Sequence, residues 1–204
     1  MSKQSPHRPK QPPEQNPELE PLNRAELLVA MAATAIILLL VARIWSFFDP
    51  FRFPSALSWR DTGIGGLVGL GISAMSACTY QFWPAYKRSA DSYLAFVLAP
   101  LFLSDSIWIG LLPGISEELL FRGVMLPALG QNATGLVISS LCFGVLLMSA
   151  PKQWPYAIWA TSIGMVLGLS ALLTGNLLVP IVAHVVTNFI SSFFWQLSRS
   201  NKVS

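Results

Sequence analysis

Long apolar segments separated by short polar stretches dominate the chain from about residue 25 onward. A transmembrane helix needs about 20 mostly apolar residues to cross about 30 Å of hydrocarbon. On this criterion the pattern predicts about seven spans, at residues 25–48, 62–83, 93–112, 117–130, 133–149, 156–173 and 176–197. Tryptophans fall near the ends of these segments, as an interfacial aromatic belt would place them: Trp45, Trp59, Trp83, Trp154 and Trp195. We therefore expect an all-α fold, a polytopic transmembrane bundle of about seven helices.

The N-terminal residues have a different composition. Residues 1–24 contain six of the fifteen prolines together with Gln, Glu, Lys and Asn, and few apolar side chains. Such a segment cannot bury enough apolar surface to fold, so it predicts a disordered tail ahead of a first transmembrane helix that is retained. The chain then divides into this tail, two N-terminal transmembrane helices over residues 25–89, a membrane core over 90–198 and a polar tail over 199–204.

The charge content restricts the class of protein further. Only 11% of the residues are charged and 53% are hydrophobic, whereas an ordinary soluble domain has about 25% charged residues. These values exclude a typical soluble globule, a disordered chain and a nucleic-acid binder. The net charge of +3 comes from Lys and Arg in the tail and in short gaps such as Lys87-Arg88, which suits loops facing anionic lipid headgroups. We expect a multi-pass integral membrane protein whose partner is the lipid bilayer and whose N-terminus is cytoplasmic.

One pair of small residues bears on how the helices associate. Gly65 and Gly69 are four residues apart, a spacing that allows two helices to approach closely. The pair is consistent with packing within the chain and also with dimerisation. The oligomeric state is therefore left open.

Few ionisable residues lie inside the apolar segments. A charge at the bilayer centre costs at least about 2.5–3.5 kcal/mol on insertion scales, so such residues are candidates for function. Five remain once the loops and the end regions of the spans are set aside: Asp105, Glu117, Glu118, Arg122 and His184. Asp105 is flanked by serines, which favours the cap of a half-helix or a position near the interface.

The densest group is formed by two carboxylates and an arginine. The pair Pro113-Gly114 predicts a break, after which Ser116 caps a new helix with both carboxylates in its first turn. Glu118 and Arg122 are four residues apart and can pair on one face of that helix. Glu117 points about 100° away and has no cation close by in the sequence, so we expect it to face a cavity.

The last apolar segment offers a second polar pair. His184 and Asn188 are four residues apart, so they project from the same face of a helix. Both need hydrogen-bonding partners in lipid, and both can donate hydrogen bonds to a developing oxyanion. Residues 174–176, Thr-Gly-Asn, predict only a tight turn between two spans.

Two stretches of the sequence resemble a known family. The first, GISEELLFRGV over residues 114–124, contains the motif Glu-Glu-x-x-x-Arg, and the second, TGNLLVPIVAHVVTN over residues 174–188, ends in His-x-x-x-Asn. Together they resemble the CPBP intramembrane metalloprotease family, which comprises CAAX prenyl endopeptidases and bacteriocin-processing or Abi-type proteins. The resemblance covers roughly residues 90–198.

The resemblance implies an all-helical membrane core around a water-filled cavity and cleavage of a peptide or membrane-protein substrate. It implies that Glu117 activates the water that attacks a peptide carbonyl. It also implies that His184 and Asn188 stabilise the oxyanion, while Glu118 and Arg122 support the site.

The middle motif of the family differs in this chain. Its pattern Phe-x-x-x-His aligns with residues 143–147, so Leu147 stands where the family has histidine. A leucine cannot orient water, transfer a proton or bind a metal. For a divalent metal the chain offers only Glu117, Glu118 and His184, with poor spacing for a set of three or more ligands. We therefore assign no metal ligands and leave the cofactor open.

Three functions follow from these observations. The first is a membrane-embedded endopeptidase, and the second is a non-catalytic scaffold, chaperone or immunity protein that binds a peptide segment without hydrolysis. Leu147 weighs against the first, and the retained Glu117, His184 and Asn188 weigh against simple loss of the site. The third is a small transporter, which is disfavoured because the hydropathy shows no inverted repeat.

Overall fold

The computed structural model describes residues 22–49, 53–148 and 150–203, and these ranges contain helices and no strand. The all-α fold class is therefore confirmed. The proline-rich tail that we predicted lies almost wholly outside the described residues. The helices are α1 (Arg24–Phe48), α2 (Trp59–Phe82), α3 (Pro84–Leu98), α4 (Ser106–Leu120), α5 (Leu126–Ala128), α6 (Ala133–Leu146), α7 (Trp154–Thr174) and α8 (Leu178–Val203). Because α8 continues to Val203, residues 199–203 extend the last helix.

The number of spans is smaller than the sequence predicts. Among the described residues, four helical segments are long and apolar enough to cross a membrane: 24–48, 59–82, 151–174 and 178–199. Residues 84–98 and 103–128 form a fifth, broken span or a re-entrant loop, bent by 102°. The helix at 133–146 is shorter, so the described residues contain four or five candidate spans instead of the seven predicted.

The break in the middle of the chain lies earlier than predicted. α3 ends at Leu98, two residues before Pro100, which has no N–H for a helical hydrogen bond. By contrast, α4 continues through Pro113-Gly114, and Ser116 does not cap a helix but donates a hydrogen bond from Oγ to the Leu112 carbonyl at 2.7 Å. The two predicted segments 93–112 and 117–130 are therefore wrong, and the carboxylates lie in the last turn of α4.

Local signals explain the other helix ends. α1 starts with a capping box in which Asn23 and Glu26 each accept the other's backbone N–H, at 3.0 and 2.9 Å. Asn132 caps α6 by accepting the N–H groups of two residues in its first turn. α7 ends at Gly175, whose φ of +64° is the left-handed conformation that glycine adopts without strain. The predicted turn at residues 174–176 is confirmed.

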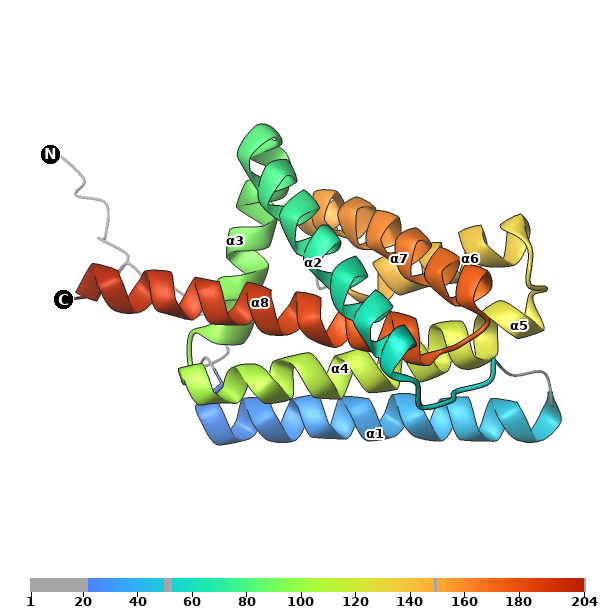
Figure 1. The fold of residues 1–204 in the computed structure, drawn as a ribbon. Coiled ribbons are helices and arrows are strands. Elements are labelled where there is room, and N and C mark those ends of the chain that lie inside the picture. Colours follow the sequence, from blue (N-terminus) through green and yellow to red (C-terminus); the bar gives the residue numbers. More distant parts are fainter. Residues whose placement is uncertain (1–21, 50–52, 149, 204) are drawn as a thin grey trace, which may run out of the picture.

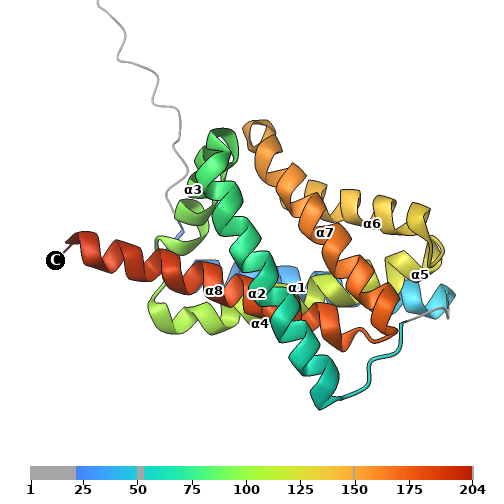
Figure 2. The same ribbon diagram turned by 45° about the horizontal axis from the view of Figure 1, so that its top comes forward.

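The helices pack in an order that places α4 at the centre. α1, α4 and α8 run side by side, with α4 in contact with both of the others (Figure 1). α2 crosses α8, and α6 packs along α7 (Figure 2). α3 stands across these layers and contacts α2 and α7.

Two pairs of glycines allow α8 to be packed closely on two sides. A Cβ added at Gly65 or Gly69 of α2 would lie 2.7 Å from a carbonyl oxygen of α8. On α4, a Cβ at Gly110 would lie 3.0 Å from the carbonyl oxygen of Val185, and one at Gly114 would lie 2.6 Å from Cγ2 of the same residue. The role of Gly65 and Gly69 in packing within the chain is thus confirmed. α2 and α4 both approach α8 at glycines, which have no side chain. The polar residues of α8 therefore lie next to those of α4.

The outer surface is apolar, as expected for a protein surrounded by lipid. On α1, the exposed side chains include Ile36, Ile37, Leu40 and Ile44, each more than half exposed. A continuous apolar surface of this kind is unusual on a soluble monomer but is suited to hydrocarbon. The apolar helices and their exposed faces support a multi-pass integral membrane protein.

Candidate functional site

Polar residues of α4 and α8 line a partly open cavity of about 480 Å³. Glu117, His184 and Asn188 all contribute to its wall, and the remaining surface comes mainly from apolar side chains of α1, α3, α6 and α7. The expectation that Glu117 faces a cavity is therefore confirmed, and His184 and Asn188 line the same cavity.

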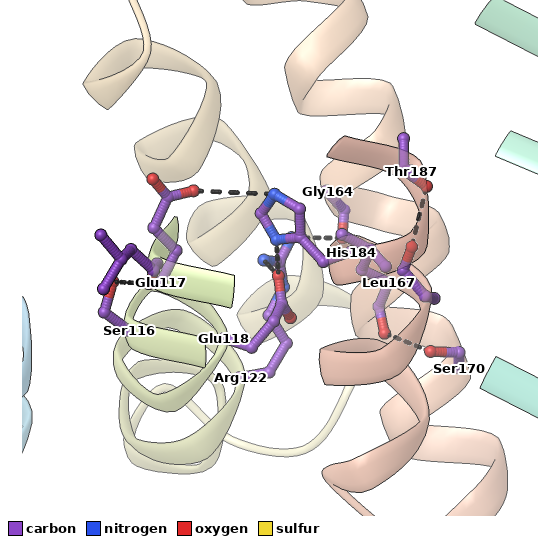
Figure 3. A network of polar contacts seen from close by, with 11 residues as sticks. Ser116, Glu117, Glu118, Arg122, Gly164, Leu167, Ser170, His184 and Thr187 are labelled. Carbon is purple, nitrogen blue, oxygen red and sulfur yellow. Dashed lines mark hydrogen bonds and ion pairs between the residues drawn. The ribbon is translucent and has the colours of Figure 1, made fainter. Parts of the chain in front are cut away.

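Beneath the cavity, Glu118 and Arg122 form the ion pair predicted from their spacing. Nη1 of Arg122 donates to Oε1 of Glu118 at 2.6 Å, and both side chains are fully buried. Nη2 of Arg122 donates to the carbonyl oxygen of Gly164 on α7 at 2.9 Å (Figure 3). The guanidinium carbon also lies 4.5 Å from the centre of the Phe143 ring of α6. Arg122 therefore joins three helices around one buried carboxylate.

The backbone around Arg122 has unusual helical geometry. Phe121–Met125 forms a π-helical turn between α4 and α5, of the kind often found at functional sites. Pro127 has no N–H to offer the Gly123 carbonyl one turn earlier, and that carbonyl instead accepts the N–H of Phe53 at 3.4 Å. This bond attaches the segment before α2 to the turn that holds Arg122.

His184 connects the ion pair to the cavity. Its Nδ1 lies 2.8 Å from Oε1 of Glu118 (Figure 3). A carboxylate paired with an arginine only accepts hydrogen bonds. Nδ1 therefore carries a proton and donates the hydrogen bond to Glu118. Nε2, on the other side of the ring, faces Oε2 of Glu117 at 3.9 Å. The Phe143 ring packs at right angles to the imidazole, with centroids 5.7 Å apart, and limits its rotation.

Glu117 differs from Glu118 in having no close hydrogen-bonding partner. It is 7% exposed, and among the described residues no hydrogen bond reaches its Oε2 atom. Its direction, about 100° around the helix from Glu118, agrees with the expectation that it faces a cavity. A buried carboxylate without a hydrogen bond is costly unless a ligand or water uses it.

The other predicted polar residues separate into two groups. Asn188 lines the cavity, and no described residue hydrogen-bonds its amide. Asp105 lies elsewhere: its carboxylate accepts hydrogen bonds from Nε and Nη2 of Arg24 at 2.8 and 2.7 Å, and from the backbone N–H of Phe102. Asp105 thus fastens the start of α1 to the turn before α4. Asn176 is also structural, since its side chain bonds both backbone groups of Ala56.

Two contributors to the site were not identified from sequence. The carbonyl of Gly164 accepts from Arg122, and a Cβ added to that glycine would lie 3.1 Å from Nη2 of the arginine. In the sequence, residue 164 is only a glycine within an apolar segment, and nothing there indicates that its carbonyl binds an arginine. Phe143 appeared only as the first residue of a motif, without an indication that its ring packs on both Arg122 and His184.

The side chains around the cavity do not fit a metal ion. In the part of the chain that the structure describes, no group of three or more His, Cys, Asp and Glu residues could hold one. Nδ1 of His184 and Oε1 of Glu118 already bond each other, and Leu147 brings no donor atom to its place on the cavity wall. Of the described His, Cys, Asp and Glu residues, Glu117 and His184 line the cavity, which is fewer than the three protein ligands of a typical catalytic zinc site.

Comparison with known proteins places the resemblance in the half of the chain that contains this site. Residues 99–190 match the family model described as "Type II CAAX prenyl endopeptidase Rce1-like", and the predicted resemblance is thereby confirmed. The chain is also similar to the uncharacterized protein YpbD of Bacillus subtilis (strain 168), with 28% identity over 171 residues that cover 81% of this chain and 83% of that protein. No solved structure matches the chain.

Proposed function

Since residues 99–190 are similar to the Rce1-like CAAX prenyl endopeptidases, we propose that this protein is a membrane-embedded endopeptidase that cleaves a peptide or membrane-protein substrate. The observation that carries the proposal is the pair of atoms that face each other in the cavity, Oε2 of Glu117 and Nε2 of His184, 3.9 Å apart. Asn188, which also lines the cavity, supplies a further polar group.

Glu117 acts as the general base. Its Oε2 atom has no hydrogen bond from a described residue, so it is free to take a proton from a water molecule held in the cavity. The water oxygen then attacks the peptide carbonyl, and the proton passes from Glu117 to the leaving nitrogen. Because the cavity is largely apolar, the electrostatic interactions within it are less screened than they would be in water.

His184 and Asn188 stabilise the negative charge that develops on the carbonyl oxygen. Because Nδ1 of His184 donates to Glu118, Nε2 carries a proton only when the ring is an imidazolium. With that form, the charges of Glu117, Glu118, Arg122 and His184 sum to zero. The sum remains zero when Glu117 takes up the water proton and the oxyanion forms, so the site need not accommodate a net charge in either state.

Glu118 and Arg122 position the histidine. The carboxylate fixes the proton on Nδ1 and balances the imidazolium charge, as the orienting acid does for histidine bases in general. Arg122, held by Gly164, keeps Glu118 in place. Neither residue needs to contact the substrate.

A second function is favoured by one observation. Leu147 lines the cavity at the position where the family has histidine, and it offers no polar atom to a substrate. A site that lacks this group but retains a large apolar cavity is suited to holding a peptide segment without cleaving it. The second candidate is therefore a non-catalytic membrane scaffold, chaperone or immunity protein.

A proteolysis assay in liposomes separates the two. The probes are three internally quenched peptides: a farnesylated CAAX peptide, its unprenylated counterpart and a transmembrane peptide. We expect the wild-type protein to cleave at least one of them, and Glu117→Gln to abolish cleavage because the amide retains size and polarity but is no base. The variant should unfold at the wild-type temperature. Equal, background-level signals from the wild type and Glu117→Gln with all three probes would support the scaffold instead.

A further inference from the structure

Two tyrosines line the same cavity as Glu117. Tyr93 belongs to α3 and Tyr156 to α7, and their rings are stacked with centroids 4.5 Å apart and an angle of 26° between the planes. They come from helices outside the two sequence motifs.

A wider set of aromatic contacts holds the two rings in place. Tyr156 also stacks on Tyr86, with centroids 6.3 Å apart and planes within 5°. Tyr86 in turn contacts Trp159, whose indole N–H donates to Ser76 of α2 at 3.2 Å. Aromatic pairs at such separations stabilise each other beyond the effect of the area that they bury. The phenols are therefore held in fixed positions before a substrate enters.

The tyrosines of this stack differ in their exposure. Tyr93 and Tyr156 are half-buried, and within the residues that the structure describes no hydrogen bond occupies either hydroxyl. Tyr86 lines the same cavity but is buried, with 6% of its surface exposed. Tyr93 and Tyr156 thus have donors available at the cavity and are the more accessible of the three.

Leu147, at the end of α6, lines this cavity too and has no hydrogen-bond donor. We propose that Tyr93 and Tyr156 are catalytic residues that supply the donors missing at Leu147, by hydrogen-bonding the oxyanion of the tetrahedral intermediate. The inference rests on the proposed endopeptidase function and names residues outside its two motifs.

The chemistry requires no other reactant than water. As the water oxygen bonds to the carbonyl carbon, the electron pair of the C=O bond moves to the oxygen, and the phenol O–H groups stabilise that charge without transferring a proton. The oxyanion electron pair then re-forms the C=O bond as the C–N bond breaks. The electron pair of the C–N bond goes to the nitrogen, which takes the proton that Glu117 removed from the water. The products are a carboxylic acid and an amine.

Phenylalanine substitutions test the proposal because they remove only the hydroxyl. With the three liposome probes, the double variant Tyr93→Phe/Tyr156→Phe is expected to lose about 100- to 1,000-fold in kcat with little change in KM, the usual effect of losing an oxyanion donor. Tyr86→Phe is the matched control, since it removes a hydroxyl from the same stack, and it should keep the wild-type kcat. Unfolding temperatures in detergent should be equal for all variants.

A rescue experiment distinguishes a chemical role from a structural one. Adding Leu147→His to the double variant returns a polar group to the cavity, so kcat should rise again. A loss of activity that accompanies a lower unfolding temperature and is not relieved by Leu147→His would overturn the inference. So would a double variant as active as the wild type, although the endopeptidase function would then stand. A wild-type protein that cleaves none of the probes would overturn both.

Discussion

Nε2 of His184 and Oε2 of Glu117 face each other at 3.9 Å, one from α8 and the other from α4. This separation depends on how closely the two helices cross. Val185, next to the histidine, packs against Gly114, three residues before the glutamate. Because Gly114 has no side chain, Val185 lies close to α4. This contact therefore sets the distance between Nε2 of His184 and Oε2 of Glu117.

We expect Gly114→Ala to disturb the site and Gly66→Ala to leave it intact. A Cβ at Gly114 would lie 2.6 Å from Cγ2 of Val185 and 3.0 Å from its backbone nitrogen, so α4 must move away from α8. Such overpacking typically costs about 1–3 kcal/mol. At Gly66 no atom lies within 4 Å of the added carbon, and alanine should raise helix stability by up to about 1 kcal/mol.

Denaturation in mixed detergent micelles measures both free energies of unfolding. The two variants make the same chemical change in α4 and α2, so a difference between them reports the close contact alone. Equal free energies for Gly114→Ala and Gly66→Ala would show that α4 and α8 are not packed in this way.

Glu118 and Arg122 should behave as a coupled pair. Removing one member leaves an uncompensated buried charge, which costs about 3–5 kcal/mol, whereas removing both costs less. Arg122→Met should therefore be more destabilising than Glu118→Gln/Arg122→Met, in which the glutamine oxygen can still accept from His184. The free energy of unfolding in detergent is the measurement, with the exposed Arg43→Met as control. Additive, mild effects would mean that the pair is not buried together.

The site itself follows from short-range spacing to a large extent. Glu118 and Arg122 pair because they are four residues apart on one helix, and the same spacing puts His184 and Asn188 on one cavity wall. The adjacent Glu117 points in another direction for equally local reasons. The structure contains these side-chain arrangements even though the helix with the carboxylates was predicted to begin at the wrong place.

The remaining features arise from contacts that have no local signal. Pro113-Gly114 predicted a break, but the packing of Gly114 on Val185 and the hydrogen bond of Ser116 to the preceding turn maintain the helix. The carbonyl of Gly164 and the phenols of Tyr93 and Tyr156 come from helices far away in sequence. Their positions follow from how α3 and α7 pack, which the apolar pattern does not encode.

His184→Ala and Asn188→Ala should each slow cleavage while leaving the fold in place. Loss of one oxyanion donor typically lowers kcat by about 100- to 1,000-fold. His184→Ala is expected to have the larger effect, because it also leaves Oε1 of Glu118 without one of its two donors. The measurement is kcat with the most rapidly cleaved liposome probe, and Phe194→Ala, an exposed position on the same helix, is the control. Wild-type rates for Asn188→Ala would exclude its amide from the reaction.

Leu147→His should raise the activity of the otherwise unchanged protein. The side chain lines the cavity, so histidine there would place a donor and acceptor beside the reacting groups. A well-positioned acid–base group contributes about 100- to 10,000-fold, and a newly introduced one should give a fraction of this. Leu147→Phe fills similar space without a polar atom and should not accelerate cleavage.

The gain in kcat from Leu147→His should also depend on the two tyrosines. If Tyr93 and Tyr156 already hydrogen-bond the oxyanion, the gain should be smaller in the wild-type background than in the Tyr93→Phe/Tyr156→Phe variant. An equal gain in both backgrounds would indicate that histidine acts at another step, and no gain in either would show that position 147 does not reach the substrate.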